Sequence, residues 1–121
     1  MMNDNGGVVF ISSGSARFHV PGYAVYACCK GAIEVFSRYV AKEYGPRGIR
    51  ANVVAPGAIE TDFNGALIRN SPQTQAFIVS QTALGRVGRA DDIGSVVAFL
   101  CSEDAKWVNG QKIEVSGGIN L

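Results

Sequence analysis

The pattern of apolar and polar residues along the chain predicts three strands. Short runs of mostly apolar, often β-branched residues that end at glycine, proline or polar positions are typical of strands buried in a sheet. Such runs occur at residues 8–12, 49–55 and 111–115. Asn52 lies inside the second run, and we interpret this amide as a structural link that hydrogen-bonds neighbouring loops.

Two longer segments predict helices. The first begins near residue 23 or 24 and is ended by Gly45 and Pro46. Its apolar positions recur at helical spacing and predict a buried face made of Val25, Cys29, Ile33, Phe36 and Val40. The second helix is predicted over residues 91–101, where Asp91 and Asp92 place negative charge at the positive end of the helix dipole.

The order of these elements predicts an α/β fold. Residues 62–82 are polar and irregular in pattern, and we expect one or two short helices there. The order strand, helix, strand, short helices, helix, strand is typical of a parallel sheet with right-handed crossovers. We therefore expect half of a doubly wound, Rossmann-like sheet, with the two long helices on opposite faces. The first strand is expected at an edge, where bare backbone groups favour association.

Net charge and the lengths of the apolar runs limit where in the cell the chain is expected and which classes of partner it is expected to bind. A net charge of +1 over 121 residues gives no electrostatic basis for binding nucleic acid or an anionic membrane. No apolar run approaches the roughly 20 residues of a membrane-spanning helix, and the first residues lack the apolar region of a signal peptide. We therefore expect one cytoplasmic domain that binds neither nucleic acid nor membrane.

The cysteines and the histidine do not predict a metal site. Cys28, Cys29, Cys101 and His19 lack the spacing of zinc ligands. We expect no metal, and we expect the cysteines to be small buried thiols in a reducing compartment. His19 is expected in a loop near the substrate, without a catalytic role.

Candidate chemistry concentrates between Ser13 and Lys30. Ser13 follows the first strand, so it is expected at the carboxyl edge of the sheet, where open α/β sheets bind ligands. Tyr26 and Lys30 are four residues apart on the predicted helix and share a face. A lysine ammonium beside a phenol favours the phenolate, which can exchange a proton with an alcohol oxygen. A Tyr-x-x-x-Lys pair alone also occurs as an ordinary surface pair; the serine upstream favours the catalytic interpretation.

A second candidate feature follows the second strand. Pro56 and Gly57 end that strand, and a turn there leaves backbone donors and acceptors unpaired at the ligand edge. By itself such a turn is an ordinary strand terminator. Apolar residues beyond it either line a pocket or pack the short helices onto the core; they are Phe63, Leu67, Ile68, Phe77 and Ile78.

Together these motifs resemble the short-chain dehydrogenase/reductase family. The segments VVFISS, YACCKGA and GIRANVVAPGAIETD carry the resemblance, and GRVGRADDIGSVVAFLCS resembles the last long helix of that family. The resemblance implies that Ser13, Tyr26 and Lys30 are catalytic. Tyr26 would be the general acid/base, Lys30 would support its deprotonation and bind the nicotinamide ribose, and Ser13 would orient the substrate oxygen.

The resemblance also implies a cofactor and a reaction. The cofactor would be NAD or NADP, which this part of the fold does not distinguish. The residues implied to bind it are Tyr26, Lys30, Pro56, Gly57, Ile59 and Thr61. The reaction would transfer hydride between the nicotinamide and a small-molecule alcohol or ketone. A homo-oligomer is expected.

Only the second half of such an enzyme is recognisable. The Gly-rich turn Thr-Gly-x-x-x-Gly-x-Gly that cradles the pyrophosphate does not occur in the sequence. We therefore expect residues 1–121 to form the catalytic half of a domain. The alternative is a truncated, non-catalytic chain that associates through its helix faces. A Rossmann-like methyltransferase would leave both the Ser13–Tyr26–Lys30 spacing and the turn at Pro56 unexplained.

Overall fold

A computed structural model describes residues 3–121, and its elements follow the predicted order. The strands are β1 (Gly7–Ile11), β2 (Arg50–Pro56) and β3 (Lys112–Val115). The helices are α1 (Ala24–Glu43), α2 (Leu67–Asn70), α3 (Pro72–Gln81) and α4 (Ala90–Cys101). Short 3₁₀ turns lie at Gly14–Ala16, Gly45–Arg47 and Glu103–Ala105. The predicted order of strands and helices is confirmed, and the polar segment holds two short helices.

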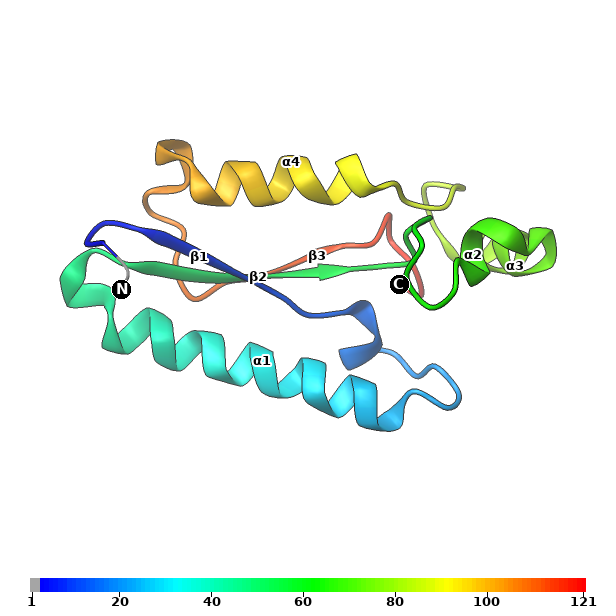
Figure 1. Ribbon diagram of the computed structural model, residues 1–121, viewed down its shortest axis with the longest axis horizontal. Helices are drawn as coiled ribbons and strands as arrows, with labels where there is room; N and C mark the ends of the chain where they lie inside the picture. Colours follow the sequence, from blue (N-terminus) through cyan, green and yellow to red (C-terminus); the bar gives the residue numbers. More distant parts are fainter. Residues whose placement is uncertain (1–2) are drawn as a thin grey trace.

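The three strands form one parallel sheet in the order β1-β2-β3. β1 pairs with β2 from Gly7↔Arg50 onward, and β2 pairs with β3 from Val53↔Lys112 onward. Figure 1 shows α1 below the sheet and α4 above it. The α/β fold, the opposite placement of the long helices and the edge position of β1 are therefore as predicted.

The core lies around the middle strand. Val54 of β2 packs with Leu100 of α4 and with Ala105, and partly buried apolar residues of β1, α4 and β3 surround them. Asn52, which is fully buried in β2, connects the strand to the turn before β3: its Nδ2 donates to the Val108 carbonyl at 2.8 Å, and its Oδ1 accepts from the Gln111 N–H at 3.0 Å. The interpretation of Asn52 as a structural link is confirmed, because each hydrogen-bonding atom of its amide has a partner.

The predicted buried face of α1 is wrong at Val25, Cys29 and Phe36, which are exposed, whereas Ile33 and Val40 are partly buried. Val25 is 80% exposed and Phe36 is 58% exposed, whereas the buried residues of this helix are Ser37 and Ala41. Small side chains at these two positions let the helix backbone approach β2 closely. The Phe36 ring, although largely exposed, meets the Phe10 ring of β1 edge-on at a centroid distance of 5.6 Å. The apolar pattern of this helix therefore includes exposed positions as well as partly buried ones.

Two further expectations about the helices need correction. The cysteines are not buried thiols: Cys28, Cys29 and Cys101 are free and exposed, because they lie on the outer surfaces of α1 and α4. The end of α1 also differs from the expectation, since the chain continues into a 3₁₀ turn and the left-handed residue is Gly48 (φ 69°) rather than Gly45.

The start of α4 depends on one of the two predicted acidic residues. Asp92 accepts a hydrogen bond from the Arg89 N–H at 2.7 Å, which closes the first turn of the helix. Within residues 3–121, none of the helices is long and apolar enough to cross a membrane. The cytoplasmic location stays a prediction.

Candidate active site

The predicted site residues meet at the carboxyl ends of the strands. At this end of the sheet the chain forms α2 and α3, which lie beyond the strand ends in Figure 1. A cavity of about 670 Å³ opens here between the sheet, the first turns of α1 and the two short helices. The predicted residues that line it are Ser13, Tyr26, Lys30, Pro56, Gly57, Ile59 and Thr61. Their roles stay predictions, but their predicted meeting at one place agrees with the structure.

Ser13 is positioned by the 3₁₀ turn that follows β1. Its Oγ caps this turn and accepts hydrogen bonds from the Ser15 N–H at 3.2 Å and from the Ser15 hydroxyl at 3.0 Å. Gly14 allows the turn to pack tightly, because a Cβ at this position would come within 2.7 Å of the Phe18 ring. Since Ser13 accepts both bonds, its own hydroxyl hydrogen is free to donate to a ligand oxygen.

Tyr26 and Lys30 lie on the first turns of α1, on the side that faces β1. The Lys30 Nζ donates to the carbonyl of Ile11, the last residue of β1, at 2.9 Å. It also lies 5.5 Å from the centroid of the Tyr26 ring. Among residues 3–121, no side chain or backbone group hydrogen-bonds the Tyr26 hydroxyl, so it is free to bind a ligand in the cavity. The lysine thus holds the helix to the strand end and places a cation beside the tyrosine.

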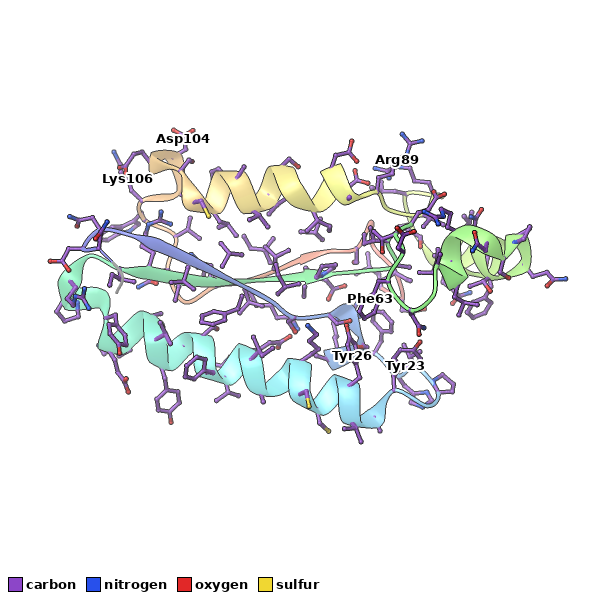
Figure 2. The ribbon with its side chains drawn as sticks, in the orientation of Figure 1. Tyr23, Tyr26, Phe63, Arg89, Asp104 and Lys106 are labelled. Carbon is purple, nitrogen blue, oxygen red and sulfur yellow. The ribbon has the colours of Figure 1, made fainter. Side chains whose placement is uncertain are left out.

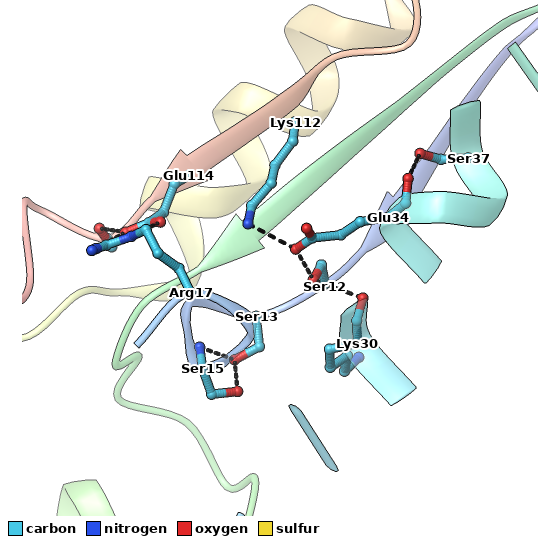
Figure 3. A network of polar contacts seen from close by, with 10 residues as sticks. Ser12, Ser13, Ser15, Arg17, Lys30, Glu34, Ser37, Lys112 and Glu114 are labelled. Carbon is cyan, nitrogen blue, oxygen red and sulfur yellow. Dashed lines mark hydrogen bonds and ion pairs between the residues drawn. The ribbon is translucent and has the colours of Figure 1, made fainter. Parts of the chain in front are cut away.

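A polar network beneath the cavity joins α1 to the sheet (Figure 3). The hydroxyl of buried Ser12 contacts both the Glu34 carboxylate at 2.7 Å and the Lys30 carbonyl at 3.1 Å. On the other side, Lys112 of β3 pairs with the same carboxylate at 2.9 Å. These contacts fix the position of α1 along β1, and therefore the position of Tyr26 and Lys30 relative to Ser13.

Sequence reasoning missed this network. Its signal was a charged residue, Glu34, one turn beyond Lys30 on the same face of the helix. The spacing of apolar residues alone does not indicate this contact, because a charged side chain lies on the partly buried side of the helix.

A second ion pair closes the site from the side of β3. Arg17 makes two hydrogen bonds of 2.7 Å to the Glu114 carboxylate and also binds the carbonyls of Ile119 and Asn120. The hydrogen bond from Arg17, together with a further bond from Ser116, holds the pKa of Glu114 below its ordinary value, although partial burial opposes this. The loop that follows Ser13 is thereby tied to β3 and to the end of the chain.

The turn after β2 leaves a free backbone donor and acceptor. Gly88 donates to the Ala58 carbonyl at 3.0 Å and accepts from the Glu60 N–H at 2.9 Å. In a parallel pairing of this kind, the N–H and C=O of the residue between, Ile59, point to the opposite side. Within the described residues these two groups have no hydrogen-bond partner.

This arrangement fits the carboxamide of a nicotinamide, which needs one acceptor for its NH₂ and one donor for its oxygen. The nearby Thr61 Oγ1 accepts from the Phe63 N–H at 3.3 Å, which leaves its hydroxyl hydrogen free as a further donor. Gly57 keeps the turn compact, because a Cβ there would lie within 2.7 Å of Ser116. The residues of this turn therefore suit the nicotinamide cofactor that the family resemblance implies.

Aromatic residues surround Tyr26. The Tyr23 ring meets the Tyr26 ring edge-on at a centroid distance of 5.9 Å, and the Phe63 ring lies 6.4 Å from it on the other side. Figure 2 shows Tyr23, Tyr26 and Phe63 grouped between α1 and the segment that leads to α2. The Asn64 side chain donates to the Tyr23 hydroxyl at 2.6 Å and so joins this segment to α1. Sequence reasoning missed Tyr23; its signal was a second aromatic residue directly before the same helix, three positions from Tyr26.

The apolar residues between β2 and α4 line the cavity, which decides between the two alternatives left open by the sequence. These residues are Phe63, Leu67, Ile68, Phe77 and Ile78. By contrast, the part of the chain that the structure describes contains no group of His, Cys, Asp and Glu residues that would hold a metal ion.

Comparison with known proteins gives matches along the whole chain. Residues 1–120 match the family described as enoyl-(acyl carrier protein) reductase. The chain is 42% identical over 118 residues to an uncharacterized oxidoreductase of Methylorubrum extorquens. It is 40% identical over 121 residues to the 3-oxoacyl-(acyl-carrier-protein) reductase FabG of Escherichia coli. These alignments cover 98% and 100% of this chain but 48% of each relative. The chain thus spans about half the length of the curated relatives it matches.

Solved structures show the same likeness. The promiscuous reductase LugOII, which catalyses a keto-reduction in lugdunomycin biosynthesis, superposes with a TM-score of 0.90 at 38% identity, over 99% of this chain and 46% of that chain. The angucycline C-6 ketoreductase LanV, solved with NADP, gives a TM-score of 0.90 at 35% identity over the same shares. A 3-oxoacyl-(acyl-carrier protein) reductase from Brucella melitensis, solved with NAD, gives a TM-score of 0.84 at 32% identity. The match covers 96% of this chain and 41% of that chain.

Proposed function

The chain belongs to the short-chain dehydrogenase/reductase family, whose members use nicotinamide cofactors, and from this premise we propose that it is the catalytic half of an NAD(P)-dependent oxidoreductase. The reaction is the interconversion of a secondary alcohol and a ketone. The observation that supports this proposal is that Ser13, Tyr26 and Lys30 line the same cavity as Ile59, whose backbone N–H and C=O are free.

Each residue has a role that its contacts support. The Tyr26 hydroxyl, which is free in the cavity, gives a proton to the ketone oxygen or takes one from the alcohol. Lys30, held against the end of β1, keeps a positive charge beside that phenol. The Ser13 hydroxyl donates to the same substrate oxygen and stabilises the charge that develops on it.

Groups that line the same cavity would hold the cofactor. Ile59 would offer its backbone N–H and C=O to the nicotinamide carboxamide, Thr61 would offer its hydroxyl, and Lys30 would bind the ribose. When bound, the nicotinamide supplies or accepts the hydride. Relatives solved with NADP and with NAD support a nicotinamide cofactor for this chain.

The test is turnover of a polypeptide that joins this chain to the first half of a family member carrying the Gly-rich turn. We expect Tyr26→Phe to lower NADPH consumption with a ketone by at least about 100-fold, because general acid/base catalysis contributes that much. Cofactor affinity should change little. Tyr39→Phe is the matched control, since Tyr39 lies on the exposed part of the same helix and does not line the cavity. Retained activity in Tyr26→Phe would remove Tyr26 from its role.

A truncated, non-catalytic chain is the second candidate. The outer face of α1, where Val25, Phe36 and Tyr39 are exposed, supports a chain that associates with intact relatives. This candidate predicts no turnover by the joined polypeptide and co-elution of the chain with an intact family member. Turnover that depends on Tyr26 would contradict it.

A further inference from the structure

Part of the cavity lining consists of large apolar side chains that the protein leaves exposed. Phe63 is 70% exposed and Phe77 is 68% exposed, and Leu67 is exposed as well. All three line the cavity. Exposed apolar groups gathered in one concave surface are typical of a binding site, because a ligand that covers them removes their apolar surface from water.

The cavity carries little charge. Among the residues that line it, all of which belong to the described range 3–121, there is no Asp, Glu or Arg. Its basic side chains are Lys30, which already donates to the Ile11 carbonyl, and the imidazole of His19. An anionic group deep in this cavity would therefore lose its water without gaining a free lysine or an arginine.

Several polar side chains of the lining already have partners within the protein. Thr74 donates to the Ser71 hydroxyl at 2.8 Å, and Asn64 donates to the Tyr23 hydroxyl. Ser15 donates to Ser13. A substrate with many hydroxyl groups would have to compete for these bonds, whereas an apolar body would leave them intact.

We propose that this site selects a neutral ketone or alcohol with a bulky apolar body, and that Phe63 determines this specificity. This inference rests on the proposed function, since it places the carbonyl of that substrate at Tyr26. Phe63 lies beside the Tyr26 ring at 6.4 Å, so its ring contacts the part of the substrate next to the reacting carbon. Leu67 and Phe77 of the two short helices contact the rest of the apolar body.

The test is equilibrium binding to the chain itself, by saturation-transfer NMR and calorimetry, so that it does not depend on turnover. The probes are 2-tetralone, a neutral ketone with a two-ring apolar body; the same ring system carrying a carboxylate; and dihydroxyacetone. We expect 2-tetralone to bind, and both other probes to bind at least about tenfold more weakly, the difference expected for burying one large apolar side chain. Equal binding of the carboxylate or of dihydroxyacetone, or no binding of 2-tetralone, would overturn the proposal.

Substitutions in the apolar lining test whether Phe63 is responsible for the binding of 2-tetralone. Phe63→Ser should weaken 2-tetralone binding about tenfold, and Phe77→Ser gives a second, independent test if the first variant does not fold. Trp107→Ser is the matched control, because Trp107 is 96% exposed and does not line the cavity. Unchanged binding in a folded Phe63→Ser chain would remove Phe63 from its role.

The same experiment separates this inference from the proposed function. Tyr26→Phe should retain 2-tetralone binding, since it keeps the ring, while it abolishes turnover of the joined polypeptide. Binding preference without Tyr26-dependent turnover would contradict the proposed function alone. Turnover of hydrophilic or anionic ketones in preference to apolar ones would contradict the substrate class alone.

Discussion

Single residues with several partners determine how the site is held. Arg17 joins the loop after Ser13 to Glu114 of β3 and to the carbonyls of Ile119 and Asn120. Lys30 both binds the end of β1 and lies beside Tyr26. In each case one side chain connects a candidate catalytic residue to a part of the chain far away in sequence, so its loss should affect the geometry of the site as well as stability.

The Arg17–Glu114 pair gives a prediction about pH. Because Arg17 lowers the pKa of Glu114 in the folded state, the pair stabilises the fold above the unfolded-state pKa of about 4.3. This contribution should be lost as pH falls further, through the lower pKa of the folded state. We expect Glu114→Gln to be less stable than the wild type near neutral pH, and the difference to shrink in acid.

Urea unfolding of both chains over a series of pH values measures this difference. Glu60→Gln, which changes an exposed carboxylate, is the control and should show no such trend. A difference between wild type and Glu114→Gln that stays constant down to the most acidic pH would contradict the prediction.

At the scale of elements, local patterns predicted which segments form strands and helices but not which side of α1 is buried. Spacing of apolar residues indicated a face with Val25 and Phe36, yet both are exposed. The buried face contains Ser37 and Ala41 because α1 packs close against β2. Glu34 also lies on this side, where Ser12 and Lys112 satisfy its carboxylate. Local periodicity does not contain these contacts, since one partner directly follows β1 and the other lies in β3.

Close packing of α1 gives a prediction about Ser37, which is 1% exposed. We expect Ser37→Leu to lower the free energy of unfolding by roughly 1–3 kcal/mol, because extra methylenes in a close-packed contact force the helix away from the sheet. The measurement is urea unfolding, with Val35→Leu on the exposed side of the same helix as control. A Ser37→Leu chain as stable as the control would show that α1 does not pack closely here.

At the scale of the whole molecule, two surfaces leave apolar or unpaired groups uncovered. The Ser12 N–H and the Gly6 carbonyl bond to β2, so the backbone groups of the alternate residues Gly7 and Val9 face the free edge of β1. The Ile11 carbonyl faces the same edge but accepts from Lys30. The outer face of α1 exposes Tyr39 and its apolar neighbours. Both surfaces favour association, and the homo-oligomer expected from the sequence stays a prediction.

We expect light scattering to give a mass above the 12.8 kDa of the monomer. The expected contact between copies is the outer face of α1. Tyr39→Glu should then lower the measured mass, because it would bury a charge without a partner at the interface. Lys42→Gln, on the exposed part of the same helix, controls for the change in net charge, because it also makes the chain more negative by one charge. A monomeric wild type would contradict the expected association, and an unchanged oligomer in Tyr39→Glu would indicate the edge of β1 instead.

The sequence by itself determined the order of elements, the parallel α/β class and the family, and it predicted the candidate set Ser13, Tyr26 and Lys30. These depend on local signals: residues at a strand end and on one face of a helix are placed by the geometry of the element that carries them. Only the tertiary structure decided the buried face of α1, the Arg17–Glu114 pair and the aromatic group around Tyr26. Those depend on how closely elements approach one another and on contacts between distant segments, which no local pattern specifies.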